Sequence, residues 1–299
     1  LTAWSKIGVI EASHFDPEAA FVAVDRHRLD DLGAYVLRTR DGGKTWASVA
    51  RGIPDGSYVN VVREDPERRG LLYAGTETGV FVSFDEGDHW QSLQANMPNC
   101  SVRDLAVRRG DLVAATHGRS FWVLDDLTPL RQLDAKVAAA PAWLFQPRTA
   151  IRLNPAPFQG TPEPKDEAKA ANPPLGAVFD YSLGAASPSP VVLEVLDARG
   201  ELVRRYASDD KVEAPDLQRI PVTPDWVDVA EAPPAAAGMH RFVWDLRYAA
   251  PKELPRSRRE QPRGVWAPPG RYSVRLVANG HTLIQPLVVE KDPRISSTE

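Results

Sequence analysis

Two stretches of the sequence decide the fold: TRDGGKTW at residues 39–46 and SFDEGDHW at residues 83–90. Each has a hydroxyl side chain followed by Asp, Gly and Trp at the same spacing, and Asp85 follows Asp41 by 44 positions. An Asp carboxylate can accept backbone N–H bonds across a tight turn, and Gly adopts the positive φ that such a turn needs. The sequence therefore predicts a repeated turn in which six residues have a structural role: Asp41, Gly43, Trp46, Asp85, Gly87 and Trp90.

Short segments rich in β-branched and aromatic residues surround both turns. The first turn follows FVAV (21–24) and YVLRT (35–39), and the second follows VNVVR (59–63) and LLYAGT (71–76). A third unit contains VRDLAV, LVAAT and FWVLD between residues 102 and 125, but it has no such turn. Units of about 40–45 residues with four short strands each are typical of β-propeller blades. We predict two nearly complete blades and three strands of a third.

The composition excludes several classes of protein. The chain has 299 residues, a formal charge of −4, 43% hydrophobic and 25% charged residues, which is the range of ordinary globular proteins. No basic block offers a surface for nucleic acid, and no apolar run is long enough for a membrane span. Cys100 is the only cysteine, so an intrachain disulfide and a multi-cysteine zinc site are excluded. We expect no metal and no cofactor.

Strand patterns of another kind fill the second half. Of the 27 prolines, only 5 lie in residues 1–133, so the two halves are built differently. Strand segments bounded by turn signals, such as the hairpin around Ala198-Arg199-Gly200, favour a β-sandwich. We predict an all-β chain: incomplete propeller blades over 1–133, a linker with one strand and a Pro/Ala-rich mobile loop over 134–174, the sandwich over 175–292, and the start of a truncated segment over 293–299.

The first half resembles the end of an Asp-box (BNR-repeat) β-propeller of the sortilin-like kind. With THGRSFWVLDDL at 116–127, it more closely resembles large exported bacterial proteins labelled "glycosyl hydrolase, BNR repeat". The runs LEVLDARGELVRRY (193–206), HRFVWDLRY (240–248) and PPGRYSVRL (268–276) resemble the immunoglobulin-like domain of flagellar hook-capping proteins. The resemblance to BNR-repeat propellers implies a secreted or periplasmic protein. It also implies that this chain is a piece of that protein and that the remaining propeller blades lie upstream.

The loops on the side opposite the Asp turns hold the candidate site. Arginine can hold a carboxylate or sugar hydroxyls, and Asp, Glu or His can act as acid or base. The predicted ligand-binding residues are Arg26, His27, Arg28, Glu77, His117 and Arg119. The candidate catalytic residues are Asp30, Asp31, Glu77 and His117. The alternative is that these loop tips are polar only because they face water.

Two functions remain open from the sequence. The first is an exported propeller protein that binds glycan or peptide on this loop face, and the second is a sialidase- or glucanase-like glycoside hydrolase using carboxylates on the same face. RGIP at 51–54 only imitates the Arg-Ile-Pro element of sialidases. A calcium site at Asp25, Asp30 and Asp31 has too few regularly spaced oxygen ligands. Ser120, near His117, lacks a nucleophile elbow.

Overall fold

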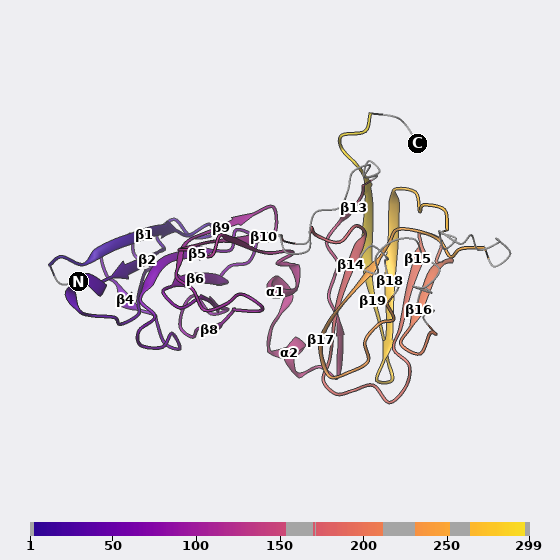
Figure 1. The fold of residues 1–299 in the computed structure, drawn as a ribbon, viewed down its shortest axis with the longest axis horizontal. Helices are drawn as coiled ribbons and strands as arrows, with labels where there is room; N and C mark the ends of the chain where they lie inside the picture. The colour runs from indigo at the N-terminus through magenta and orange to yellow at the C-terminus, as the bar shows by residue number, and fades with distance from the viewer. Residues whose placement is uncertain (1–2, 154–169, 171, 212–230, 252–263, 297–299) are drawn as a thin grey trace. The chain divides into compact units, whose positions relative to one another are not determined.

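The computed structural model describes residues 3–153, 170, 172–211, 231–251 and 264–296. The chain divides into two compact units, Leu1–Leu127 and Thr128–Glu299, and Figure 1 labels most of their strands. Both units consist mainly of antiparallel β-sheet, which confirms the predicted all-β fold. Within the described residues, no helix is long and apolar enough to cross a membrane.

The first unit contains three antiparallel sheets whose strands pair in chain order, as in propeller blades. Blade 1 consists of β1 (Lys6–Ala12), β2 (Ala20–Asp25), β3 (Tyr35–Thr39) and β4 (Ala47–Ser48). Blade 2 consists of β5 (Val59–Glu64), β6 (Leu72–Thr76), β7 (Val80–Ser83) and β8 (Gln91–Ser92). Blade 3 consists of β9 (Val102–Arg108), β10 (Asp111–Thr116) and β11 (Phe121–Leu124). The predicted partial propeller of about three blades is confirmed.

The two Asp turns have the hydrogen bonds expected from the sequence. Asp41 accepts from the backbone N–H of Thr45 at 2.9 Å and from the Thr45 hydroxyl at 2.6 Å. Asp85 accepts from the backbone N–H of His89 at 2.9 Å, and its second oxygen lies 2.7 Å from His89 Nδ1. Gly87 has a φ of +93°, which favours glycine at that position. The carboxylates therefore serve their own turns.

An apolar core joins blades 1 and 2. Phe21 and Val36 of blade 1 pack in it with Val62, Leu72 and Trp90 of blade 2. The indole N–H of Trp90 donates to the carbonyl oxygen of a blade 1 residue, Val49, at 2.7 Å. The buried Trp90 thus holds blades 1 and 2 together, both through its apolar burial and through its hydrogen bond.

The equivalent tryptophan of blade 1 has a different environment. Trp46 is 42% exposed, whereas Trp90 is 5% exposed. Its indole N–H donates to Gly43 of its own turn at 3.0 Å, rather than to a neighbouring blade. The same motif is therefore a packing element in blade 2 and a surface element in blade 1.

The first strands of the blades lie side by side and are irregular at equivalent places. β5 packs against β1 on one side and β9 on the other (Figure 1). In each strand the pairing with the second strand of the blade skips one residue, which is Gly8 in β1, Asn60 in β5 and Arg103 in β9. Each skipped residue is a β-bulge, a feature that re-aims a side chain.

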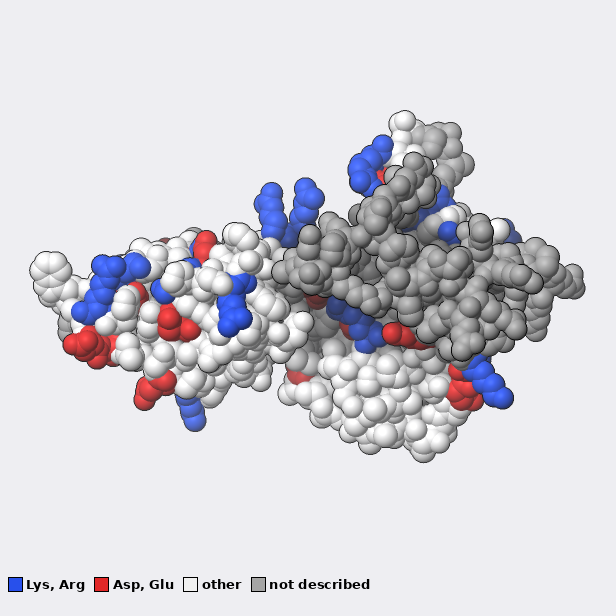
Figure 2. Space-filling view, viewed as in Figure 1, with Lys and Arg blue, Asp and Glu red and all other residues white. Residues whose placement is uncertain are grey.

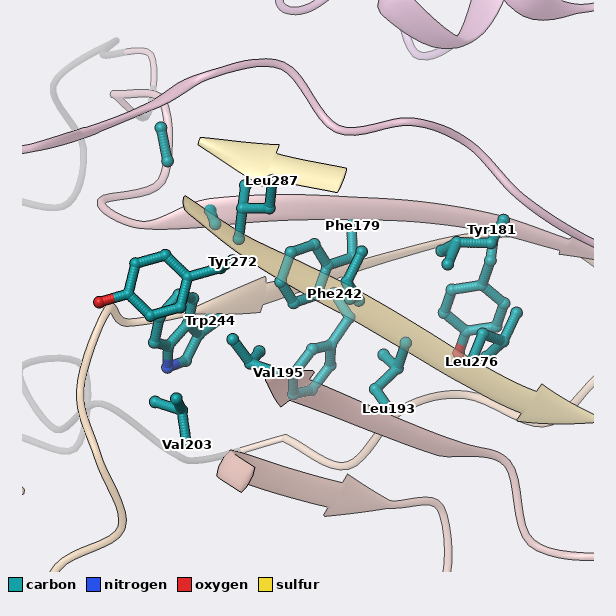
Figure 3. Packing of buried hydrophobic residues seen from close by; sticks show 14 of the residues in the cluster. Phe179, Tyr181, Leu193, Val195, Val203, Phe242, Trp244, Tyr272, Leu276 and Leu287 are labelled. Carbon is teal, nitrogen blue, oxygen red and sulfur yellow. The ribbon is translucent and has the colours of Figure 1, made fainter. Parts of the chain in front are cut away.

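Two packed sheets form the second unit, as the predicted β-sandwich requires. One sheet has the order β12 (Ala142–Leu144), β14 (Ala177–Leu183), β17 (Gly238–Trp244). The other has the order β13 (Ala150–Arg152), β19 (His281–Lys291), β18 (Gly270–Ala278), β15 (Val192–Asp197), β16 (Leu202–Ala207). Figure 3 shows Phe179 and Phe242 of the first sheet packed among Leu193 and Leu276 of the second. Trp244 is fully buried in this core.

The stretch between the predicted domains has more structure than the single strand expected there. Helices α1 (Thr128–Gln132) and α2 (Ala135–Ala139) precede two strands, β12 and β13. β12 pairs with β14, and β13 runs parallel to the end of β19 at residues 289–291. Three-residue strands exist only through such distant pairing, so the local sequence pattern did not show the second one. Most of the Pro/Ala-rich mobile loop predicted at the end of this linker lies outside the described residues.

The contrast between the two tryptophans predicts unequal effects of the same substitution. Trp90→Ala should lower the free energy of unfolding of the first unit by about 3–5 kcal/mol, because it opens a cavity in the core and leaves the Val49 carbonyl without its donor. Trp46→Ala should cost less than about 1.5 kcal/mol, because that ring is already partly in water. Urea denaturation of both variants measures the difference. Equal losses would contradict the packing described here.

Candidate functional site

Asp25 and His27 form a hydrogen-bonded pair in blade 1, where the chain leaves β2. Asp25 is the last residue of that strand and only 3% exposed. Its Oδ1 accepts from the backbone N–H of His27 at 3.0 Å and lies 2.6 Å from His27 Nδ1. His27 begins the short 3₁₀ helix η1 (His27–Leu29), and its imidazole remains partly exposed. A buried carboxylate thus fixes the orientation of a ring at the surface.

Tyr58 connects this pair to blade 2. The rings of His27 and Tyr58 stack with their centroids 4.8 Å apart and their planes 18° apart. Tyr58 precedes β5, and its hydroxyl hydrogen-bonds Glu77, which lies between β6 and β7. Its carbonyl oxygen also accepts from the backbone N–H of Glu77 at 3.1 Å. The tyrosine therefore supports both the imidazole and the carboxylate.

Blade 3 completes the arrangement through Ser101 and Arg103. Glu77 Oε2 accepts from the Ser101 hydroxyl at 2.7 Å and lies 3.4 Å from Arg103 Nη2. Arg103 Nη1 also donates to Asn60 Oδ1 at 3.3 Å. Polar side chains of three blades are thus linked in a continuous set. We call this set the rim network, and it comprises Asp25, His27, Tyr58, Glu77, Ser101 and Arg103.

The carboxylates of this region are held in their ionised form. Burial by itself would raise the pKa of Asp25, but hydrogen bonds and charge from His27 outweigh it and lower that pKa. Burial likewise opposes ionisation of Glu77, whose pKa is nevertheless lowered by hydrogen bonds from Ser101 and Tyr58. Hydrogen bonds from the Gly33 N–H and the Tyr35 hydroxyl, together with the charge of Arg26, lower the pKa of Asp31.

The structure brings only some of the predicted site residues together. His27 and Glu77 share the rim network, and the charge of His27 helps to lower the pKa of Glu77. Arg26 is held locally, because its Nη1 lies 3.1 Å from Asp31 and its guanidinium lies over the Tyr35 ring. Two further predicted residues are exposed: Arg28, which lies in η1, and Asp30, which follows it.

His117 and Arg119 occupy an exposed turn between β10 and β11. The backbone N–H of His117 donates to the Ser101 carbonyl at 2.8 Å, which places this turn beside the rim network. The charge of Arg119 acts on the buried thiol of Cys100, whose pKa burial raises and Arg119 lowers in part. The turn thus borders the network without a side-chain bond from His117 or Arg119 to it among the described residues.

Sequence reasoning missed Tyr58, Ser101 and Arg103, and considered Asp25 only as a calcium ligand. A usable signal was present, because Tyr58 and Ser101 both stand immediately before the first strand of a blade. That position faces the neighbouring blade, so a repeat alignment marks it as a contact between blades. No group of three or more His, Cys, Asp and Glu suited to a metal ion occurs among the described residues. Basic and acidic side chains lie interspersed on the face of the first unit in Figure 2.

Comparison with known proteins gives only distant similarities. The sequence matches no protein-family model and no curated protein. It is similar to the structure of YCF48 bound to D1 peptide, with 17% identity over 42% of this chain and 40% of that chain, and a TM-score of 0.31. A GH74 enzyme from Niastella koreensis is 12% identical over 48% of this chain and 24% of its own, with a TM-score of 0.33.

A third similar structure is the extracellular domain of a hybrid two component system from B. thetaiotaomicron. It is 10% identical over 95% of this chain and 32% of its own length, with a TM-score of 0.32. The chain therefore spans between 24% and 40% of these three structures. Similarities this low say nothing about the site.

The lowered pKa of Asp25 predicts a pH-dependent contribution to stability. Its ionised form stabilises the fold above its unfolded pKa of about 4, and this stabilisation is lost as the pH falls through the lower folded pKa. Asp25→Asn should therefore lower the free energy of unfolding by about 1–2 kcal/mol at neutral pH, and by less below about pH 4. Urea denaturation at several pH values measures this difference.

Asp30→Asn is the matched control, because Asp30 is exposed and adjacent in the chain. It should change the free energy of unfolding by less than about 0.5 kcal/mol at any of these pH values. An Asp25→Asn effect that stays the same from neutral to acid pH would rule out the ionised pair as its source.

Proposed function

We propose that the first unit binds a glycan or a peptide on the loop face that carries the rim network. The observation that supports this proposal is the linkage of polar side chains from three blades into one set. Loop tips that are polar only because they face water need no shared partners. Here Asp25 is buried against His27, and Glu77 is held by both blade 2 and blade 3. Preorganised polar groups of this kind reduce the cost of binding a ligand.

The candidate ligand-binding residues have different roles in this proposal. His27 and Glu77 are already fixed by their contacts, so they present a rigid part of the site. Arg28, His117 and Arg119 are exposed and reach the ligand from the border of the site. Arg26 contributes indirectly, because it holds Asp31 in place.

A glycoside hydrolase is the second candidate, with Asp30, Asp31, Glu77 or His117 as catalytic groups. It is favoured by an ionised carboxylate, Glu77, close to the partly exposed imidazole of His27. A glycosidase also needs a carboxylic acid that stays protonated, which requires a raised pKa. The pKa values of Asp31 and Glu77 are both lowered, so neither suits that role. Binding without turnover fits the electrostatics better.

The turn hydrogen bonds and the blade repeat support a relationship to Asp-box (BNR-repeat), sortilin-like propellers. The two packed sheets of the second unit support the proposal of an immunoglobulin-like module. A secreted or periplasmic location rests on that resemblance. Further blades are proposed partners of the first unit, because its outer faces carry exposed apolar side chains. Ile10 in blade 1 is 66% exposed, and Phe121 in blade 3 is 74% exposed.

Screening the chain against a glycan array and a peptide library tests the proposed function. We expect retention of ligands without turnover of chromogenic glycosides, and weaker binding by Glu77→Gln, His117→Ala and Arg119→Ala. The two exposed-turn variants should melt like the parent, whereas Asp85→Ala, in the opposite turn, should cost about 1–3 kcal/mol of stability and leave binding intact. Turnover that is lost in Glu77→Gln or Asp31→Asn would establish the hydrolase instead. Binding unchanged in all three loop variants would discard this face as the site.

The exposed blade faces predict association of the isolated chain. Light scattering should show species larger than the monomer, or hydrophobic dyes should bind to the first unit, because apolar sheet faces and a free strand edge favour contacts with other chains. Limited proteolysis should cut the first unit before the sandwich. A monodisperse monomer whose residues 1–127 resist protease as well as residues 176–290 would contradict the proposal of further blades.

A further inference from the structure

The bulged residues of the three blades line one cavity at the rim of the first unit. Gly8, Asn60 and Arg103 are the residues skipped in the ladders of β1, β5 and β9, and all three line a cavity of about 370 Å³. Bulges are found at barrel rims and beside active sites, where they re-aim side chains. The same irregularity in three consecutive blades indicates that this cavity is built into the repeat rather than left by imperfect packing.

The wall of the cavity is fixed before any ligand arrives. A Cβ atom at Gly8 would overlap the carbonyl oxygen of Asn60, so only glycine allows β1 to lie this close to β5. The Asn60 amide donates to the carbonyl of Val102 at 3.0 Å and accepts from Arg103 Nη1 at 3.3 Å. Its side chain is therefore locked between blades 2 and 3.

Two basic side chains at the cavity make only long ionic contacts, Lys6 with Asp25 and Arg103 with Glu77. Lys6 is 63% exposed, and its Nζ lies 3.9 Å from Asp25, beyond hydrogen-bond distance. Arg103 Nη2 lies 3.4 Å from Glu77, which is also long for a charged pair. Arg63, a third basic residue at the cavity, already makes three hydrogen bonds. Lys6 and Arg103 therefore have hydrogen-bonding capacity left for a ligand.

We propose that this cavity binds a carboxylate group of an acidic peptide, with Lys6 and Arg103 as the groups that contact it. The inference rests on the proposed function and names the class of ligand. A carboxylate in the cavity would accept short charge-assisted hydrogen bonds from Lys6 and Arg103, which are the strong ones in proteins. The group is supplied either by an Asp or Glu side chain or by the terminal carboxylate of the peptide.

The lining favours a peptide over a glycan. None of the described residues that line the cavity is aromatic, so it has no ring face on which a sugar could stack. Each bulge takes a residue out of the strand ladder, which frees main-chain groups for an extended peptide. The cavity also contains Asp25 and Asp104, whose carboxylates accept from N–H donors.

Peptide pools that differ only in their carboxylates test the proposal on the full chain. Three N-acetylated octapeptide pools are passed over the immobilised protein: one with Asp and Glu and an amidated end, one without them and with a free C-terminus, and one with neither. Mass spectrometry measures the retained fraction. We expect one carboxylate pool to be retained about tenfold better than the neutral pool, and that pool identifies the source of the group.

Substitutions at the two contact residues provide the second readout. Lys6→Met and Arg103→Met should reduce retention to the level of the neutral pool. Arg199→Met, which removes an exposed arginine of the second unit, is the matched control and should retain peptides like the parent. Because the Lys6 side chain is exposed, Lys6→Met decides the result if Arg103→Met fails to fold.

Three outcomes would overturn the inference. The first is equal retention of all three pools, and the second is a carboxylate preference that survives in Lys6→Met. The third is a uronic acid oligosaccharide retained through Lys6 and Arg103 while no peptide is retained. The proposed binding function survives each of these results. If the parent chain retains no peptide and no glycan, the proposed function fails as well.

Discussion

The close packing of the first strands of neighbouring blades is the constraint on which the rest of the first unit depends. β5 lies between β1 and β9, and three contacts fix it there: Gly8 against the Asn60 carbonyl, the Asn60 amide to Val102 at 3.0 Å, and Arg63 Nε to the Leu105 carbonyl at 2.8 Å. These contacts set the register between blades. The cavity lies along these strands, and Tyr58, Ser101 and Arg103 of the rim network lie at the starts of β5 and β9, so neither exists unless the blades are aligned in this way.

Apolar and polar contacts make different contributions to the packing of the blades. The apolar core between blades 1 and 2 supplies the burial that drives their association. At the side of the Asp turns, Arg38 of blade 1 donates to the Glu86 carbonyl at 2.8 Å and lies 3.0 Å from Asp88. Such directional bonds add little net energy where they are exposed, but they select one alignment of the two sheets. The side with the Asp turns is therefore structural, and the proposed recognition surface lies on the opposite loops.

The electrostatics of the loop face bears on the two functions that the sequence leaves open. In the loops opposite the Asp turns, donors surround the carboxylates of Asp25, Asp31 and Glu77, and the pKa of each is lowered despite burial or partial burial. A hydrolase of sugars divides its roles between one ionised and one protonated carboxyl group, whose environments push their pKa values apart. Here the environments push three pKa values in the same direction. These environments therefore support the proposed binding function over the proposed hydrolase.

The sequence by itself determined the repeat, the strands and the chemistry of the Asp turns, because these depend on residues within a few positions of one another. It also named His27 and Glu77 as candidates, and the structure places both in the rim network. Only the tertiary structure decided that Tyr58, Ser101 and Arg103 join them, that Trp90 is buried while Trp46 is exposed, and that residues 150–152 form a strand. The reason is physical. Each of these features depends on a contact between residues about 20 to 140 positions apart, and the packing and register of whole sheets bring such residues together, which no local pattern encodes.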